Sequence, residues 1–535
     1  MPPRASQALV VLRLYGEQAL DVTSYAAGQP TVHAPRYPQA VQEFAYQIAT
    51  HPAASIAWYD TRLGPFLSPP ERWPDLPLHP LEVLHLSSLQ RCAALVESLG
   101  LVDFSSPFLL PSPPDQRFAT WLIAPAAGIG RAAVFAALGF DPRLGSLALA
   151  LFECGYRGLA EGLCPYAEPR LLARPVPAAV LLPLQTPWPA RAVAMLVARL
   201  YRRPWLGFWL LGRALTGTGV PLWAAWHGWR IPPGLPLDRA ALADLRPPPA
   251  DPPAVPPAVD VVIPTMGRPD HLLNVLRDLA AQTVPPQRVV IIEQHPPGSA
   301  YAPLPDLAAG AWPFAIQQER VAWAGACRAR NQGLATGDAP WVLLLDDDVR
   351  LPVEWLAHLL AVATAYAVGA VTSATYLPQQ SPPAGGVPCL WPGFAGGVSL
   401  VARPATAAVR GFDQRIEGGF GEDTDYGIQL RQVGTTIVYT AAYPVLHLKA
   451  PVGGFRYPFP HPWLADPVPP RPSPTVLYAQ RKHSTPTMQA GYRLFYTLKR
   501  LTAVLPLRRP AELWRVHRQW RSAARWAAWL AAQEG

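Results

Sequence analysis

The sequence predicts an α/β protein that contains a mostly parallel sheet flanked by helices. Short apolar runs of strand character alternate with amphipathic helical segments after residue 258. Acidic and small polar residues stand where these apolar runs end. Half of the residues are hydrophobic and only 15% are charged, so wholesale disorder is excluded. In a parallel sheet the strand ends share one edge, and ligands bind beyond that edge.

Five elements alternate between strand and helix. The first helix places four apolar side chains on one face, namely Leu272, Val275, Leu276 and Leu279. Strands that are joined through helices run parallel, because the chain needs a crossover to start the next strand at the same end. The predicted elements are a strand at 259–265, a helix at 269–282, a strand at 288–294, a helix at 325–337 and a strand at 341–348.

The stretch "LLLDDDVRLP" (residues 343–352) places three adjacent carboxylates at a strand end. Like charges repel, so a cation or a group of strong donors is expected beside Asp346, Asp347 and Asp348. The alternative is a solvated acidic turn. Pro264, Thr265 and Glu293 stand at the ends of the other two predicted strands, so all of these residues are expected to line one cleft.

The chain of 535 residues is long enough for two or three domains. The stretch "RPPPADPPAVPPAVD" (residues 246–260) is expected to form a stiff extended spacer. We therefore expect domains at 1–245 and 259–456, a proline-rich linker at 246–258 and a C-terminal extension at 457–535.

The five cysteines form no CxxC pair and are odd in number, and no secretory signal or uninterrupted membrane span is present. A reduced cytoplasmic protein without a zinc site is expected. The tryptophan-rich stretch at 203–230 allows either a membrane-interface segment or core that joins the two halves.

Several motifs occur in a fixed order over residues 259–456: "VVIPT", "VIIEQ", "ACRARNQGLATG", "LLLDDDV", "GFDQRIEGGFGEDTDYGIQLRQVG" and "HLKAPVGGFR". This order resembles family 2 glycosyltransferases of the GT-A fold. The resemblance implies inverting, metal-dependent transfer of a hexosyl-type sugar from a nucleoside-diphosphate donor to a hydroxyl of a saccharide or lipid-linked acceptor. It also implies a role in the synthesis of cell-surface polysaccharide or glycolipid.

The resemblance implies roles for individual residues around the donor. Asp346, Asp348 and His447 are expected at a divalent cation, Mn²⁺ or Mg²⁺, although a lone histidine is as often simply packed or solvated. Glu293 stands where the family usually has an aspartate, which leaves the choice among UDP-, GDP- and dTDP-sugars open. The residues expected at the donor nucleotide are Pro264, Thr265, Arg268, Glu293, Arg330, Asn331, Asp346 and Asp347.

A second carboxylate pair, Glu422 and Asp423, opens a predicted helix. Acidic residues at a helix start are common because they complement the helix dipole. The resemblance instead implies that Asp423 is the general base that deprotonates the acceptor hydroxyl, with Glu422 in support. Asp425 is expected to be a helix-start residue.

The first 245 residues contain a degenerate copy of these motifs. "GFD" at 139–141 matches "GFD" at 411–413, Ala150 and Leu151 fall at the place of the acidic pair, and Asp60 can be aligned with Asp348. The alternative is chance similarity over short segments. If the repeat is real, the N-terminal half is a second GT-A-like domain that is not catalytic.

The C-terminal extension carries most of the positive charge. Residues 471–535 hold twelve Lys or Arg against two Glu, whereas the whole chain has a net charge of +9. A basic, tryptophan-rich helix suits an anionic membrane surface, and a helix packed on the protein with a solvated basic face fits equally well. No nucleic acid is expected, since no nucleic-acid-binding motif accompanies the charge. Two alternatives to a glycosyltransferase are a nucleotidyltransferase and a non-catalytic sugar- or nucleotide-binding scaffold.

Overall fold

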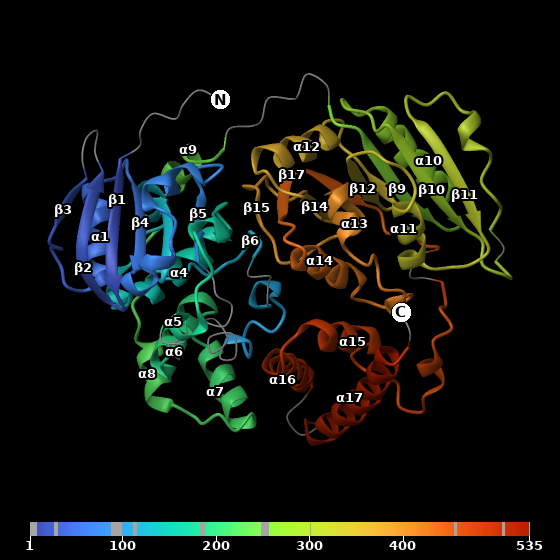
Figure 1. Cartoon of the computed structure of the whole chain (residues 1–535). Coiled ribbons are helices and arrows are strands. Elements are labelled where there is room, and N and C mark those ends of the chain that lie inside the picture. Colours follow the sequence, from blue (N-terminus) through green and yellow to red (C-terminus); the bar gives the residue numbers. More distant parts are fainter. Residues whose placement is uncertain are drawn as a thin grey trace. The chain divides into compact units, whose positions relative to one another are not determined.

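The computed structural model of the chain divides into two compact units (Figure 1). Unit 1 comprises residues 1–248 and 485–492, and unit 2 comprises residues 249–484 and 493–535. The expected linker lies mostly outside the described residues. The structure describes residues 8–25, 30–86, 99–110, 115–181, 184, 188–247, 256–299, 301–453, 457–504 and 509–533.

Unit 2 is built on a nine-stranded sheet, which confirms the predicted α/β fold class. The strand order is β11-β10-β9-β12-β16-β14-β17-β13, and β15 pairs with β17. Strands β11, β10, β9 and β12 run parallel, whereas β16 is antiparallel to both of its neighbours. The strands are β9 (Val259–Thr265), β10 (Arg288–Gln294), β11 (Ala315–Val321), β12 (Trp341–Leu345), β13 (Val349–Arg350), β14 (Ala370–Tyr376), β15 (Cys389–Leu390), β16 (Val398–Ala402) and β17 (Ile437–His447).

The helices of unit 2 bury the faces that their sequences predict. Leu272, Val275, Leu276 and Leu279 of α10 are all buried. Strand β12 ends at Leu345, so the acidic triplet follows the strand instead of completing it. The helices are α10 (Pro269–Ala280), α11 (Ala326–Leu334), α12 (Trp355–Ala365), α13 (Arg403–Ala408), α14 (Glu422–Gln432), α15 (Pro474–His483), α16 (Pro486–Thr502) and α17 (Arg509–Ala531), and α16 is divided between the two units.

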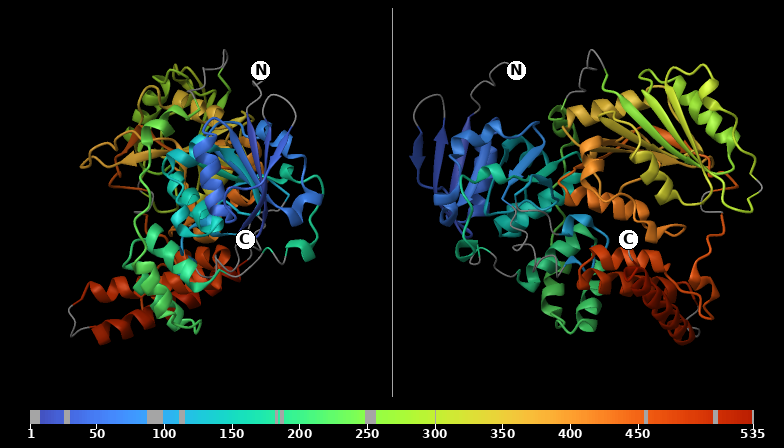
Figure 2. Two further views of the ribbon diagram at one scale, coloured as in Figure 1. Left: turned by 90° about the vertical axis from the view of Figure 1, so that its left-hand side faces the viewer. Right: turned by 45° about the vertical axis from the view of Figure 1, so that its right-hand side comes forward.

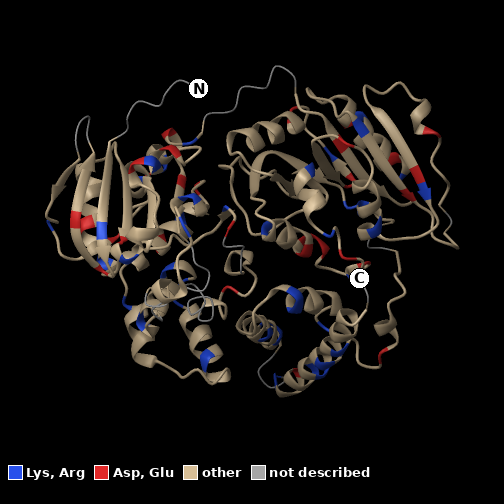
Figure 3. Cartoon of the chain, viewed as in Figure 1, with Lys and Arg blue, Asp and Glu red and all other residues tan. Residues whose placement is uncertain are grey.

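Helix α17 packs on unit 2 through a narrow apolar face. Val516, Ala523, Ala527 and Leu530 are buried, and the indole N–H of Trp526 donates to Asp466 at 2.9 Å. Its other face is rich in arginine, as the blue residues along α17 in Figure 3 show. The buried face of this helix is therefore covered by the protein itself, whereas Leu513, Trp514 and Trp529 stay exposed.

Unit 1 is built on an eight-stranded sheet in the order β3-β2-β1-β4-β7-β5-β8-β6 (Figures 1 and 2). Its strands are β1 (Leu9–Tyr15), β2 (Gln18–Tyr25), β3 (Thr31–His33), β4 (Ser55–Asp60), β5 (Glu82–His85), β6 (Phe118–Ala119), β7 (Ala127–Arg131) and β8 (Cys164–Ala167). Its helices are α1 (Ala40–Thr50), α3 (Ala132–Ala137), α4 (Leu147–Leu159), α5 (Ala178–Leu181), α6 (Ala190–Leu200), α7 (Trp205–Leu215), α8 (Leu222–Trp229) and α9 (Arg239–Asp244).

Five central strands have the same order and directions in both units. The series β1-β4-β7-β5-β8 corresponds to β9-β12-β16-β14-β17, with parallel, antiparallel, antiparallel and parallel pairings in turn. The sheets differ at one edge, where β2 and β3 pair antiparallel while β10 and β11 pair parallel. The shared core topology fits tandem GT-A-like folding of the two halves.

Backbone hydrogen bonds give a different register from the sequence alignment of Asp60 with Asp348. The N–H of Asp60 donates to the carbonyl of Ala126 at 2.7 Å, and the N–H of Asp346 donates to the carbonyl of Gly397 at 2.9 Å. Because these carbonyls precede the equivalent strands β7 and β16, Asp60 occupies the place of Asp346. The alignment was wrong by two residues, since it rested on residue identity and not on strand pairing.

The place of the acidic pair in unit 1 is apolar. The N–H of Leu163 donates to Gly158 as the N–H of Thr435 donates to Leu430, which relates the ends of α4 and α14 without a gap. Ala150 and Leu151 therefore occupy the positions in unit 1 that are equivalent to Glu422 and Asp423, and both are fully buried.

Candidate functional site

A cleft of about 480 Å³ opens at the carboxyl ends of β9, β10 and β12. This is the edge at which the parallel strands of unit 2 end. Eight of the predicted site residues line it: Pro264, Thr265, Arg268, Arg330, Asp346, Asp347, Asp348 and His447. These eight residues, which the sequence analysis selected, therefore lie together in one cleft.

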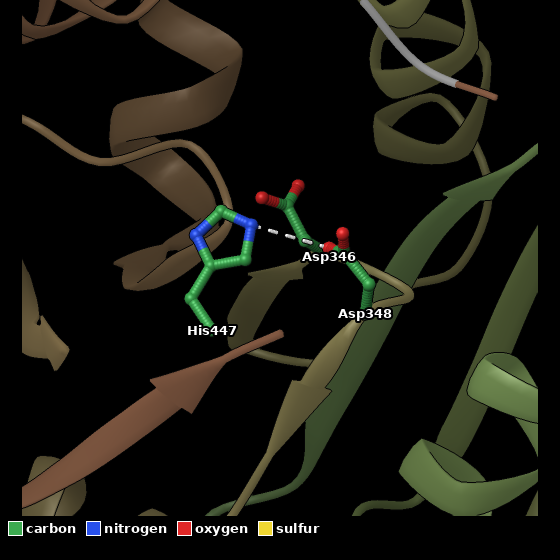
Figure 4. Close-up of side chains that lie close together, drawn as sticks. All are labelled: Asp346, Asp348 and His447. Carbon is green, nitrogen blue, oxygen red and sulfur yellow. Dashed lines mark ion pairs between the residues drawn. The ribbon is translucent and has the colours of Figure 1, made fainter. Parts of the chain in front are cut away.

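Asp346, Asp348 and His447 lie together on one side of this cleft (Figure 4). One ligand atom from each lies within 4.8 Å of the others, and His447 Nε2 is 3.3 Å from Asp348 Oδ1. Antiparallel pairing of β13 with β17 sets Val349 opposite His447 and so brings the histidine beside the triplet. Two carboxylates and one imidazole are a donor set that suits Mn²⁺ or Mg²⁺.

The contacts of Asp348 keep this carboxylate in the ionised form that a metal ligand needs. Burial alone would raise the pKa of Asp348, but its contacts with His447, Arg268 and the Ala450 N–H lower it to about 2. The hydrogen bond to Asp348 raises the pKa of His447, so a bound cation would replace the proton on this imidazole. Asp346 is the more open carboxylate, with 31% of its side chain exposed. The site thus presents an ionised, preformed carboxylate together with an accessible one.

Asp347 has a different environment from its two neighbours. Its Oδ2 accepts a hydrogen bond from the Thr265 hydroxyl at 2.7 Å, and its Oδ1 pairs with Arg268 at 2.6 Å. Burial raises the pKa of Asp347 to about 6, against the opposing charge of Arg268. Arg268 also lies 3.4 Å from Asp348, so positive and hydrogen-bonding partners make the adjacent negative charges tolerable.

Arg330 joins the triplet to the second carboxylate pair. Its Nη2 donates to Asp346 Oδ1 at 2.9 Å, and its guanidinium lies over the ring of Phe412. Burial opposes the charge of Arg330, but Asp346, Asp423 and Glu422 outweigh it and raise the pKa of Arg330. Among the described residues, Nε and Nη1 of this buried side chain have no hydrogen-bond partner. Two donors are therefore left in the space between the carboxylate groups.

Glu422 and Asp423 begin α14, after Gly421 in a left-handed conformation with φ of 113°. Burial raises the pKa of Glu422, and the charge of Asp423 adds to the effect. Burial also raises the pKa of Asp423, against the charge of Arg330. Neither residue lines the cleft itself, and Arg330 connects them to it. A carboxylate with a raised pKa is a better proton acceptor than an ordinary surface aspartate.

The structure does not bring Glu293 to the cleft. Its Oε1 accepts from the Leu304 N–H at 2.6 Å, its Oε2 accepts from Gln318 and Arg320, and only 2% of the residue is exposed. The next residue, Gln294, lines the cleft instead, because successive strand residues point to opposite faces. Following the alternation of side chains along β10 to its last residue would have selected Gln294 as the residue at the cleft.

Asn331 also lies outside the cleft lining and shapes the backbone nearby. Its Nδ2 donates to the carbonyl of Phe412 at 2.8 Å, and its Oδ1 accepts from the N–H of Phe412 at 2.7 Å. A Cβ on Gly411, which has φ of 87°, would lie 2.6 Å from that Oδ1. Asn331 therefore holds the "GFD" turn in place.

Glu417 is a cleft residue that the sequence analysis did not select. Its two carboxylate oxygens accept from the N–H groups of Cys327 and Arg328 at the start of α11, at 3.1 and 3.0 Å. A Cβ on Gly325 would lie 2.6 Å from Glu417, so glycine is required there. In the sequence, the only signal for this contact was Gly325, which stands directly before a predicted helix. The other lining residues that were not selected include Lys449, Tyr457, Phe459 and Phe420.

Comparison with known proteins identifies one region of the chain. Residues 260–386 match the family described as Glycosyl transferase family 2. This match includes Arg330 and the acidic triplet but ends before Glu422, Asp423 and His447. A search of curated proteins gives no match.

Among solved structures, the chain is similar to GalNAc-T7, crystallised with UDP, GalNAc and Mn²⁺, at 14% identity and a TM-score of 0.30. That match covers 36% of this chain and 44% of GalNAc-T7. The chain is also similar to S. aureus TarS 1–349 at 12% identity and a TM-score of 0.28, over 36% of this chain and 60% of the other. The chain thus spans less than two thirds of the length of either protein.

Proposed function

We propose that this chain transfers a sugar from a nucleoside-diphosphate donor to a hydroxyl acceptor. The premise is that residues 260–386 form a family 2 glycosyltransferase domain. The donor is a UDP-, GDP- or dTDP-sugar, and the acceptor is a saccharide or a lipid-linked sugar. Such a transfer would serve in the synthesis of cell-surface polysaccharide or glycolipid.

The grouping of Asp346, Asp348 and His447 in the cleft carries this proposal. A nucleoside-diphosphate leaving group gains negative charge as its bond to the sugar breaks. A divalent cation, Mn²⁺ or Mg²⁺, held by these three residues would neutralise that charge. Arg268 and Arg330 add fixed positive charge on the same cleft.

Asp423 is the proposed base. As the acceptor oxygen attacks the anomeric carbon, its proton passes to the Asp423 carboxylate, and the bonding pair of the sugar–phosphate bond leaves with the diphosphate. Attack from the face opposite the leaving group inverts the anomeric configuration. Glu422, whose pKa is raised by burial and by Asp423, supports the acceptor side. Arg330 keeps a compensating positive charge between this pair and Asp346.

Unit 1 is proposed to be a non-catalytic GT-A-like domain. Asp60, at the place of Asp346, is bound by Arg62 and by the N–H of Gly16, and Ala150 and Leu151 replace the acidic pair. A scaffold or acceptor platform fits these substitutions. The domain boundaries at 1–245, 246–258, 259–456 and 457–535 remain part of the proposal.

The proposed location is cytoplasmic and peripheral to a membrane. None of the described helices combines the length and the apolar character needed to cross a bilayer. Arg518 and Arg521 are exposed on α17 and could meet anionic headgroups through their charge. Vesicle binding at low salt that is unchanged by Arg518→Gln with Arg521→Gln would refute the contact through α17.

The test is donor binding and slow donor hydrolysis with UDP-, GDP- and dTDP-sugars, with and without Mn²⁺. We expect one donor to bind in the presence of metal, Asp348→Asn to abolish that binding, and Asp423→Asn to keep binding but lose turnover by about 10²–10⁴-fold. Asp60→Asn is the matched control from unit 1 and should retain both. No binding of any donor would favour a non-catalytic scaffold, and release of pyrophosphate from a nucleoside triphosphate would favour a nucleotidyltransferase.

A further inference from the structure

The helices α7 and α8 of unit 1 carry a dense group of exposed apolar side chains. Trp223, Trp226 and Trp229 are 58%, 58% and 51% exposed, and Leu215 and Leu222 are 68% and 67% exposed. Single exposed apolar residues are ordinary on a protein surface, but a contiguous group of this kind marks a surface that meets something apolar. We call the exposed faces of α7 and α8 the indole face.

The indole face is held by close packing on its other side. A Cβ on Gly228 of α8 would lie 2.6 Å from the carbonyl of Ala194 in α6, so α8 lies directly against that helix. Trp209 of α7 is fully buried. The exposed indoles therefore project from an anchored scaffold, and of the two alternatives for residues 203–230, core accounts for Trp209 but not for the exposed indoles.

The surrounding sequence is free of carboxylates. No Asp or Glu occurs between Glu168 and Asp238, whereas this interval holds eight arginines. Figure 3 shows blue and no red on α7 and α8. Arg230 lies over the ring of the exposed Trp226 at 4.9 Å, so positive charge accompanies the indole face. An apolar surface whose own stretch of chain carries arginines and no carboxylates is complementary to a layer of anionic headgroups above acyl chains.

The two helices are too short to cross a bilayer. Helix α7 has 11 residues and α8 has 8, whereas a span needs about 20. Short helices of this kind can lie along the membrane–water interface, where tryptophan is preferred. A groove of about 480 Å³ between them, lined by residues that include Leu206, Leu210 and Trp226 with Arg203, offers room for apolar groups beside a cation.

We propose that the indole face inserts into the headgroup region of an anionic lipid bilayer. This goes beyond the proposed transfer reaction, because it concerns unit 1 and requires no catalysis. It also differs from a contact of α17 through charge, since insertion of indoles and leucines persists when salt screens the charges. We propose a lipid surface as the partner of the indole face. The main alternative is a second copy of the chain.

The test is co-sedimentation of the full chain with phosphatidylcholine vesicles that contain or lack 30 mol% phosphatidylglycerol, at about 0.1 and 0.5 M salt. We expect binding to anionic vesicles that persists in part at the higher salt. Trp223→Ser with Trp226→Ser should lower the salt-resistant binding at least tenfold. Trp514→Ser with Trp529→Ser, which removes two exposed indoles from α17, should leave it unchanged.

Controls separate folding and self-association from the lipid contact. Each variant should keep the far-ultraviolet circular dichroism and melting temperature of the wild type, since the replaced indoles are exposed. Equal salt-resistant binding by the wild type and the Trp223/Trp226 variant would overturn the proposal. The absence of vesicle binding would also overturn it. A dimer, seen by light scattering, that this variant dissociates would then assign the indole face to self-association.

Discussion

Lys482 in α15 is predicted to position the helix that carries the proposed base. Its Nζ lies 2.6 Å from Asp425 Oδ1 and 2.9 Å from Asp413 Oδ2. Asp425, expected from the sequence to be only a helix-start residue, is fully buried, and His483 also binds it, at 2.7 Å. The C-terminal extension therefore neutralises a carboxylate two residues beyond Asp423.

We predict that Lys482→Met destabilises unit 2 and slows turnover more than it weakens donor binding. Removing one partner of a buried ion pair costs about 3–5 kcal/mol. Lys482 is 26% exposed, and both aspartates keep other donors, which reduces the expected loss to about 2–3 kcal/mol. A melting-temperature fall of about 5–10 °C follows for a unit of this size.

The assay combines thermal melting with donor affinity and hydrolysis rate. Displacement of α14 should lower the hydrolysis rate about tenfold while the donor Kd stays within about twofold, because a small shift of a catalytic group affects the reaction more than binding. Lys499→Met, at an exposed lysine of α16, is the matched control and should change none of these values. An unchanged melting temperature, or equal losses in affinity and rate, would refute the reasoning.

Three further predictions concern the metal group and unit 1. Gly397→Ala should weaken Mn²⁺ binding more than tenfold in calorimetry, because its Cβ would clash with the carboxylate of Asp346, whereas Gly385→Ala, with open space around it, should not. His447→Ala should lower the affinity for Mn²⁺ more than that for Mg²⁺, since Mg²⁺ gains less from an imidazole ligand, and equal losses would speak against direct ligation. Burial lowers the pKa of His85 from 6.5 to about 3, so its neutral form adds stability that is complete above pH 6.5 and declines as the pH falls. Between pH 7.5 and 5.5, His85→Leu should remove about 1.4 kcal/mol of the loss in unfolding free energy, whereas His79, whose pKa burial lowers to about 4, adds its own share in both proteins. An unchanged loss in the variant would exclude His85 as a cause.

Local pattern was sufficient for much of the fold and for the location of the cleft. Alternating apolar runs and helices placed β9, β10 and β12, and the apolar spacing of α10 identified its buried face. These features depend on neighbours in the chain, whose side-chain period differs between strand and helix. Strand β11 was not predicted, because its sequence "AIQQERV" is polar and its side chains are at least partly exposed.

The sequence by itself determined which residues stand at the strand ends, and it placed three carboxylates together there. Tertiary structure decided what each does: Asp347 pairs with Arg268, Asp348 meets His447, and Glu293 turns away from the cleft. The register of Asp60 and the pairing of Lys482 with Asp425 likewise came only from the structure. The physical reason is that partners far apart in the chain are chosen by strand pairing and helix packing, which no local spacing specifies.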